Sequence, residues 1–253
     1  MRVAVIGGSG LVGRAVLRAL GRGGHEGVAI SRSEGMDVLS GNELEGALAG
    51  CHAVVDVLNT ADTDPDGPRR FFTAATQSLL VAERAAGVAH HVVLSIAGVD
   101  RIRHNPHYVG KQHQERPART GPVPATIVRA TQFHDFAGMV ASWTRNGDST
   151  AFVPPLLVQP IDVDDVAGVL VEVATGPPSG NGPIEVAGPE QQDLVDMARR
   201  TLAARGEQLR LTTGWAAPFG VEMAGEVLLP GPDARVAPTT FDDWLARQAG
   251  AGG

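Results

Sequence analysis

Four residues able to take part in proton transfer lie close together in the sequence, namely Ser95, His107, Tyr108 and Lys111. On a helix, side chains three and four positions apart share a face, so either His107 or Tyr108 can stand beside Lys111. The phenol of a tyrosine is a slow acid because its ordinary pKa is about 10, and a neighbouring ammonium lowers that pKa. Hydride delivery to a carbonyl needs such a proton donor and a group that holds the developing oxyanion, which Ser95 can supply. The four residues therefore predict a site for carbonyl chemistry.

Lys111 is the only lysine among 21 basic residues, and Tyr108 is the only tyrosine. Arginine occupies every other basic position. A lysine kept against that bias indicates a place where a guanidinium cannot replace an ammonium, because the two cations differ in size, hydration and acidity. Chance survival of this lysine is the alternative interpretation.

A glycine pattern follows the first apolar run of the chain. Residues 7–13 read Gly-Gly-Ser-Gly-Leu-Val-Gly and lead into a sequence with apolar residues at helical spacing. Gly7 permits a tight turn, Gly10 lets a pyrophosphate approach the backbone, and Gly13 allows close packing of the helix on the strand. The free amides and the helix dipole attract a phosphate group. The pattern predicts a dinucleotide site formed by Gly7, Ser9, Gly10, Leu11, Val12 and Gly13.

The end of the second predicted strand indicates which dinucleotide is bound. An acidic residue at this place would bind the ribose diol of NAD, but the chain has Ser31 and Arg32. A hydroxyl and a guanidinium suit a 2′-phosphate, so the sequence predicts NADP(H), with a solvated surface role for Arg32 as the alternative. The other expected cofactor contacts lie near the adenine or follow later strands: Asp37, Val38, Asn59, Thr60, Ser95, Lys111, Thr131, Gln132 and Phe133.

Apolar runs alternate with helical stretches along the first two thirds of the chain, which predicts βαβ units and a parallel sheet. We expect strands at residues 2–6, 27–30, 37–39, 53–58, 91–95 and 126–128. We expect helices at residues 11–20, 43–49, 71–86, 107–116, 163–175, 193–205 and 241–248. The predicted fold is α/β, a Rossmann-type doubly wound parallel sheet with a small C-terminal substrate lobe. Residues 1–253 form a single domain in this interpretation, and residues 132–160 and 183–253 contribute the lobe.

Composition excludes several other classes of protein. The chain has 253 residues, a net charge of −7 and 43% hydrophobic residues, so it can bury a core but lacks the basic excess of a nucleic-acid-binding surface. Its single cysteine, Cys51, makes neither an intrachain disulfide nor a thiolate metal cage, and the histidine spacing matches no metal site. No apolar run spans a bilayer and no targeting leader is evident. We expect a cytoplasmic protein with a small-molecule substrate, no metal, and no nucleic-acid or membrane partner; a homo-oligomer is compatible with the sequence.

Several segments together resemble a known family. The Gly7–Gly13 motif, the Ser31-Arg32 pair, residues 94–100 (Leu-Ser-Ile-Ala-Gly-Val-Asp) and residues 128–133 (Val-Arg-Ala-Thr-Gln-Phe) are similar to those of atypical short-chain dehydrogenase/reductases. Residues 160–167, 185–189 and 241–245 extend the likeness to the NmrA-like, NAD(P)-binding branch, whose members are described as epimerases or oxidoreductases. The resemblance covers nearly the whole chain, and it implies the same fold and cofactor class without defining one reaction.

The chain departs from the family at the catalytic tyrosine. The family pattern is Tyr-x-x-x-Lys, and here His107 stands at the tyrosine position while Tyr108 is one residue late. Three interpretations stay open: His107 is the acid, Tyr108 turns toward Lys111, or proton transfer is lost. The first two interpretations both predict an NADP(H)-dependent oxidoreductase that reduces a small carbonyl or enone-like metabolite. The alternatives are an NADP-binding redox sensor without turnover and an epimerase or isomerase that uses the cofactor transiently.

Overall fold

The computed structural model describes residues 1–40, 43–147, 149–180, 182–216 and 218–250. A seven-stranded sheet lies at the centre, with all of its paired strands parallel and in the order β11-β8-β5-β4-β3-β1-β2. The strands are β1 (Arg2–Ile6), β2 (Glu26–Ile30), β3 (Ala53–Asp56), β4 (His90–Ile96), β5 (Ala125–Ala130), β8 (Ile184–Ala187) and β11 (Arg235–Val236). The prediction of a Rossmann-type parallel sheet is confirmed.

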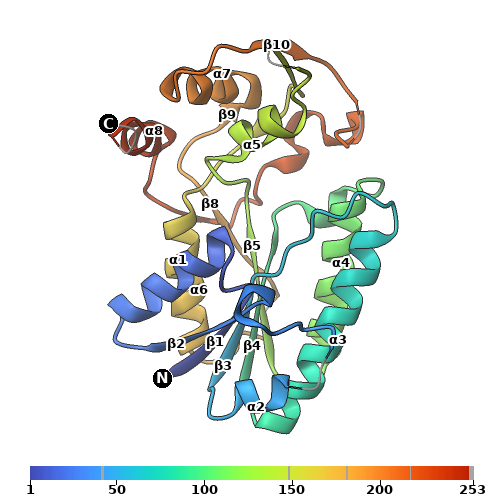
Figure 1. Ribbon diagram of the computed structural model, residues 1–253, viewed down its shortest axis with the longest axis vertical. Helices are drawn as coiled ribbons and strands as arrows, with labels where there is room; N and C mark the ends of the chain where they lie inside the picture. The colour runs from blue at the N-terminus through green and yellow to red at the C-terminus, as the bar shows by residue number, and fades with distance from the viewer. Residues whose placement is uncertain (41–42, 148, 181, 217, 251–253) are drawn as a thin grey trace.

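Helices cover both faces of this sheet (Figure 1). On one face α1 (Leu11–Arg22) packs against α6 (Val163–Thr175). On the other face α3 (Gly67–Ala86) packs against α4 (Pro106–Thr120) and the short α2 (Leu44–Leu48). Val3, Val55 and Val92 of the strands point to the first face and are fully buried there. The sheet is thus shielded from water on both sides, as parallel sheets require.

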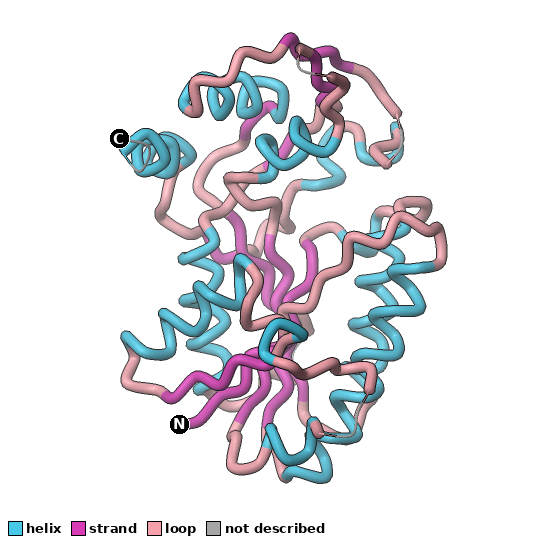
Figure 2. The backbone as a smooth tube through the Cα atoms, in the orientation of Figure 1, coloured by secondary structure: helices cyan, strands magenta, loops and turns pink. Residues whose placement is uncertain are grey.

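A smaller lobe lies beyond the carboxyl ends of the strands, at the top of Figures 1 and 2. Its elements are α5 (Phe136–Trp143), β6 (Thr150–Val153), β7 (Leu157–Val158), β9 (Gln192–Asp193), α7 (Leu194–Ala204), β10 (Arg210–Thr213) and α8 (Phe241–Gly250). The lobe has its own apolar core, which includes Val140, Leu156 and Met197. Because β5 leads into α5 and β8 leads into α7, the lobe stands over the edge of the sheet where ligands of parallel sheets bind. We expect residues 183–253 to contribute to the lobe, but two strands of this segment, β8 and β11, belong to the central sheet.

One predicted strand is wrong. Residues 37–39 form a turn, in which Asp37 accepts a hydrogen bond from the Leu39 N–H at 3.0 Å and its carbonyl accepts one from the Ser40 hydroxyl at 2.8 Å. Aspartate side chains favour such local turns over an extended ladder. The prediction failed because the apolar pair Val38-Leu39, of which only Val38 is buried, looks like part of a short strand.

Helix α4 is longer than the sequence indicated and begins at a well-defined cap. The Asn105 side chain accepts hydrogen bonds from the N–H groups of His107 (3.0 Å) and Tyr108 (3.3 Å), and Pro106 occupies the first helical position. Both features fix a helix start. The cap places His107, Tyr108 and Lys111 in the first two turns, next to the lobe. Among the described residues, no helix combines the length and apolar character needed to cross a membrane.

Candidate functional site

The glycine loop between β1 and α1 has the geometry of a phosphate cradle. Gly7 has a φ of +84°, which side-chain-bearing residues rarely adopt. A Cβ on Gly13 would lie 2.2 Å from the Gly7 carbonyl oxygen, so only glycine lets α1 pack this close to the loop. Gly10 is the residue at the N-cap of α1, and it brings no side chain over the first amides of the helix, those of Leu11, Val12 and Gly13. The loop therefore fits a dinucleotide pyrophosphate.

The residues after β2 lie on one side of this loop. Ser31 is buried, with its hydroxyl 2.9 Å from that of Ser33. Arg32 is exposed and opens a short 3₁₀ turn, Arg32–Glu34. Asp37 is exposed, whereas Val38 packs its side chain into the core beside Ile30 and Leu44. In this arrangement the guanidinium of Arg32 is the group that is free to bind an anion. The Val38 side chain anchors the same loop to the core.

Asn59 and Thr60 follow β3 at the carboxyl edge. Asn59 is exposed, and its side-chain oxygen accepts a hydrogen bond from the Thr60 N–H at 2.9 Å. The Thr60 hydroxyl accepts one from the Asp62 N–H at 3.1 Å. These bonds shape the loop at the carboxyl edge, the side of the sheet on which the glycine loop also lies.

Lys111 is a buried cation at the end of β4. Its Nζ donates a hydrogen bond to the Leu94 carbonyl oxygen at 2.6 Å and lies 4.8 Å from the centre of the Phe72 ring. Burial lowers the pKa of Lys111 to about 8, against the opposing pull of the Asp56 and Glu115 carboxylates. An ammonium with this pKa can both hold and release a proton close to neutral pH.

His107 shares a face of α4 with Lys111. Its ring packs edge-on against Phe72, with 5.7 Å between the ring centres. Burial, and then the charge of Lys111, lower the pKa of His107 to about 4. The imidazole is therefore neutral at pH 7. The pair that the structure brings together on Phe72 is His107 and Lys111.

Tyr108 points toward the lobe instead. It is buried in the apolar core of the lobe, and its hydroxyl accepts a hydrogen bond from the Gln132 side-chain amide at 3.3 Å. Burial raises the pKa of Tyr108 above its ordinary value, and the bond from Gln132 offsets this only in part. In this arrangement Tyr108 is a weak acid.

Ser95 is buried on the α4 side of β4 and pairs in register with Arg129 of β5. Its hydroxyl lies beside the Glu115 carboxylate without meeting the geometry of a hydrogen bond. Burial by itself raises the pKa of Glu115, but contacts with Arg129, Ser95 and Arg119 hold the pKa below its usual value. Ser95 thus belongs to a charged cluster beneath Lys111.

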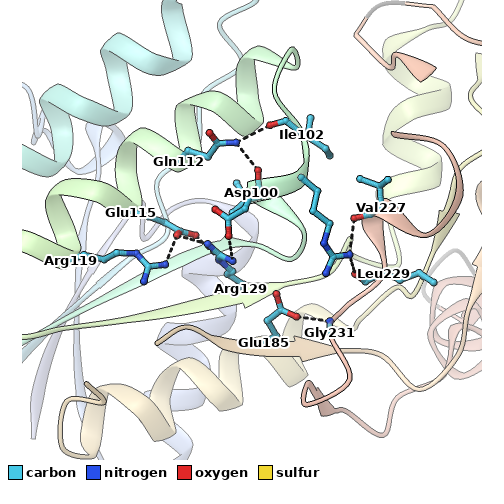
Figure 3. A network of polar contacts seen from close by, with 12 residues as sticks. Asp100, Ile102, Gln112, Glu115, Arg119, Arg129, Glu185, Val227, Leu229 and Gly231 are labelled. Carbon is cyan, nitrogen blue, oxygen red and sulfur yellow. Dashed lines mark hydrogen bonds and ion pairs between the residues drawn. The ribbon is translucent and has the colours of Figure 1, made fainter. Parts of the chain in front are cut away.

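That cluster contains functional candidates that sequence reasoning missed (Figure 3). Arg129 is bonded to Glu115 at 2.8 Å and to Asp100 at 2.7 Å, and Glu115 also pairs with Arg119 at 2.8 Å. Asp56, at the end of β3, is fully buried and accepts a hydrogen bond from the Gln114 amide at 2.8 Å. A charged residue inside an otherwise apolar strand was the signal available in the sequence for both Asp56 and Arg129.

Residues 131–133 connect β5 to the lobe. The Thr131 hydroxyl donates to the Gln159 carbonyl at 2.6 Å, and Phe133 packs against the apolar cluster under α1 and α6. The Gln132 side-chain oxygen is buried, and within the described part of the chain it meets no hydrogen-bond donor. Of the three, Gln132 therefore keeps a buried oxygen without a hydrogen-bond donor in the described part of the chain.

Comparison with known proteins agrees with this geometry. The sequence model for NAD(P)H-binding proteins matches residues 7–177, which is more than half of the chain. The chain belongs to this NAD(P)H-binding family. No curated protein sequence matches it.

Solved structures with the same fold are distant in sequence from this NAD(P)H-binding protein. A short-chain dehydrogenase/reductase superfamily protein from Agrobacterium tumefaciens with bound NAD is 19% identical, with a TM-score of 0.72 over 100% of this chain and 97% of that one. DesIV, a dTDP-glucose 4,6-dehydratase from Streptomyces venezuelae with NAD bound, is 18% identical, with a TM-score of 0.73 over 98% and 96% of the two chains. A triphenylmethane reductase from Citrobacter sp. complexed with NADP(H) is 17% identical, with a TM-score of 0.63 over 85% and 79%. The chain shares its fold with these three structures.

Proposed function

We propose that this protein is an NADP(H)-dependent oxidoreductase of the atypical short-chain type, which reduces a small carbonyl or enone-like metabolite. The observation that carries the proposal is the pair formed by the half-buried His107 and the buried Lys111 on α4, next to the edge of the sheet that holds the glycine loop. Perturbed titratable groups placed beside a cofactor cradle are characteristic of catalytic sites.

The cofactor preference rests on the residues after β2. Ser31 and the exposed Arg32 follow the strand where an acidic residue would select NAD. Arg32 would pair with the 2′-phosphate through charge-assisted hydrogen bonds. The solved relatives bind either NAD or NADP(H), so they support a nicotinamide cofactor in general.

Each residue has a distinct role in the proposed reaction. The bound nicotinamide cofactor supplies the hydride. A neutral imidazole is too weak an acid to act alone, so His107 would pass its N–H proton to the substrate oxygen while its other ring nitrogen takes a proton from the Lys111 ammonium. Lys111 would also hold the nicotinamide ribose. The burial of Ser95 beside Glu115 favours a contact with that carboxylate over a contact with the substrate oxygen.

Single-turnover oxidation of NADPH with a panel of aldehydes, ketones and enones tests the proposal. Lys111→Met and His107→Phe are each expected to slow hydride transfer by about 100-fold or more, the usual contribution of acid catalysis. Tyr108→Phe is the matched variant, and we expect a change of only a few-fold because its hydroxyl is bonded to Gln132. Equal rates in the wild type and Lys111→Met would contradict the proposal, and a large loss in Tyr108→Phe alone would transfer the acid role to Tyr108.

A second function is favoured by the state of Tyr108. Because burial raises the pKa of Tyr108 and its hydroxyl is engaged by Gln132, the tyrosine-dependent acid of the family is not activated here. A protein that binds NADP as a redox sensor would need no such acid. Similar affinity for NADP and NADPH, together with no turnover on the whole panel, would support the sensor over the enzyme.

A further inference from the structure

A buried carboxylate lies across from Lys111 and has no role in the reaction as described so far. Asp56 is the last residue of β3 and is fully buried. It pairs in register with Val93 of β4, and Lys111 is hydrogen-bonded to the carbonyl of the next residue, Leu94. The end of β3 therefore lies beside the part of β4 that binds the Lys111 ammonium, where the charge of Asp56 acts on Lys111.

Helix α4 is tied to Asp56 at a second point. Gln114, three residues after Lys111, donates a hydrogen bond from Nε2 to Asp56 Oδ2 at 2.8 Å. Asp56 Oδ1 accepts another from the Leu58 N–H at 2.9 Å. Because residues three apart on a helix share a face, the bond to Gln114 fixes the face of α4 that carries Lys111 against the end of β3.

The other charges around Lys111 are already matched. Glu115, one turn along α4, is bonded to Arg129 of β5 and to Arg119. His107 is neutral at pH 7, and α3 presents the ring of Phe72 to the ammonium. Deeper on the same face, Glu83 of α3 pairs with His91 of β4 at 2.7 Å. Of the two carboxylates whose charge acts on Lys111, Asp56 is therefore the one that is bonded only to neutral groups among the described residues.

We propose that Asp56 is a positioning residue, whose carboxylate keeps the buried Lys111 ammonium charged and holds it at the end of β4. The proposal deepens the proposed function, because it names the group that maintains the proton on which His107 draws. Without this carboxylate, burial disfavours the charged form of Lys111 and the amine is neutral at lower pH. Loss of the Asp56 charge should leave the fold in place but remove the proton of Lys111 at physiological pH.

The single lysine of the chain makes a direct test available. In protein labelled with ¹³C-lysine, the one Cε resonance reports the titration of Lys111 alone. We expect a midpoint near pH 8 in the wild type. In Asp56→Asn we expect the midpoint to fall by about one pH unit or more, the usual effect of removing a neighbouring opposite charge.

Matched variants separate charge from packing. Asp100→Asn is the same isosteric change on a carboxylate that faces Arg129 and solvent, and we expect it to move the midpoint far less. Asp56→Ser is a second test, since its hydroxyl can still accept the bond from the Leu58 N–H. An unchanged Lys111 midpoint in both Asp56 variants would overturn the proposal. Failure of both to fold, shown by circular dichroism, would also overturn it, because Asp56 would then be structural.

The pH profile of NADPH oxidation links this role to the reaction. A lower Lys111 midpoint should move the alkaline limb of the rate profile of Asp56→Asn to lower pH by the same interval. If the resonance shifts while the rate profile of Asp56→Asn matches that of the wild type, the positioning role stands and the proposed use of Lys111 in catalysis is wrong. Failure of the positioning role of Asp56 and failure of the proposed function are thereby distinguishable.

Discussion

The two faces of the central sheet are built from different kinds of residue. The face under α1 and α6 is lined mainly by valine, leucine and alanine from β1, β3, β4 and β5, with His90 and Thr126 bonded to each other near the end of α6. The face under α3 and α4 carries buried polar and charged groups from both layers, namely Asp56, His91, Ser95 and Arg129 from the strands and Glu83, Lys111, Gln114 and Glu115 from the helices. Both faces are equally shielded from water, so exposure does not explain the difference.

The contrast separates the two tasks of the site. The apolar face lets α1 approach the sheet closely at Gly13, which forms the cofactor cradle. The charged face sets the protonation of Lys111 and His107. Buried ionisable groups cost free energy unless they are paired, so their gathering on one face indicates use in chemistry. In the proposed function, binding thus belongs to one side of the sheet and proton transfer to the other.

The largest loss of stability is expected from breaking the charged face. Arg129→Met leaves Glu115 buried with only its partner Arg119, whose side chain is 41% exposed. We expect the free energy of unfolding to fall by about 3–5 kcal/mol, as for other buried pairs that lose one partner. Urea denaturation followed by circular dichroism measures this change. A loss below about 1 kcal/mol would show that the cluster is solvated and would weaken the contrast between the two faces.

A matched truncation on the apolar face should cost somewhat less. Leu170 of α6 is fully buried in the cluster under α1 and α6. We expect Leu170→Ala to lower the free energy of unfolding by about 3 kcal/mol through lost burial and the cavity it leaves. Because no charge is involved, the loss should be the same at pH 6 and pH 9. A loss that changes with pH would mean that the truncation disturbs His90, the buried histidine near the end of α6 on this face.

Neighbouring histidines on β4 sharpen the comparison further. Burial lowers the pKa of His90 to about 4. Burial alone would also lower the pKa of His91, but the Glu83 carboxylate at 2.7 Å raises it instead. His90 therefore contributes stability above pH 6.5 that is lost as pH falls toward 4, whereas the contribution of His91 is present below pH 6.5 and is lost as pH rises through its folded pKa.

Denaturation series across this pH range test the opposite signs. His90→Gln should remove up to about 3 kcal/mol of acid sensitivity between pH 6.5 and 4, the equivalent of its pKa shift. His91→Gln should lose stability most at the acid end of the range. If both variants followed the same pH dependence, the assignment of the two side chains to different environments would be wrong.

Much of the fold could be predicted because strands and helices are local patterns. Residues 2–6 and 163–175 have the predicted bounds, since each combines an apolar pattern with a clear start and stop. The strand predicted at residues 37–39 is wrong because the apolar pair Val38-Leu39 in a turn looks like a short strand. Helical spacing alone could not choose between His107 and Tyr108 as the neighbour of Lys111. That choice depends on Phe72 of α3 and Gln132 after β5, which are distant in sequence.

The buried charges could not be predicted for the same reason. Asp56 is bonded to a side chain 58 residues away, and Arg129 joins Glu115 across a strand–helix contact. A single aspartate or arginine at the end of an apolar run is compatible with solvent exposure. Only the packing of α4 on the sheet shows that both are buried.

The smallest expected effect concerns the choice of cofactor. Arg32→Ala should weaken NADPH binding by about tenfold, or roughly 1.4 kcal/mol, and leave NADH binding unchanged. Arg22→Ala, an exposed arginine in the last turn of α1, is the control and should change neither affinity. Fluorescence titration of the reduced cofactors measures both constants. An equal loss for NADPH and NADH would show that Arg32 does not read the 2′-phosphate.

The central claim is that the glycine loop at the start of α1 binds a nicotinamide dinucleotide. Isothermal titration calorimetry of the folded wild type with NADPH and NADH, repeated with Gly13→Val, tests it most directly. The account predicts saturable heat with the wild type, tighter for NADPH, and none with a folded Gly13→Val protein, whose side chain would meet the Gly7 carbonyl. Absence of binding by the wild type, or undiminished binding by the variant, would contradict it.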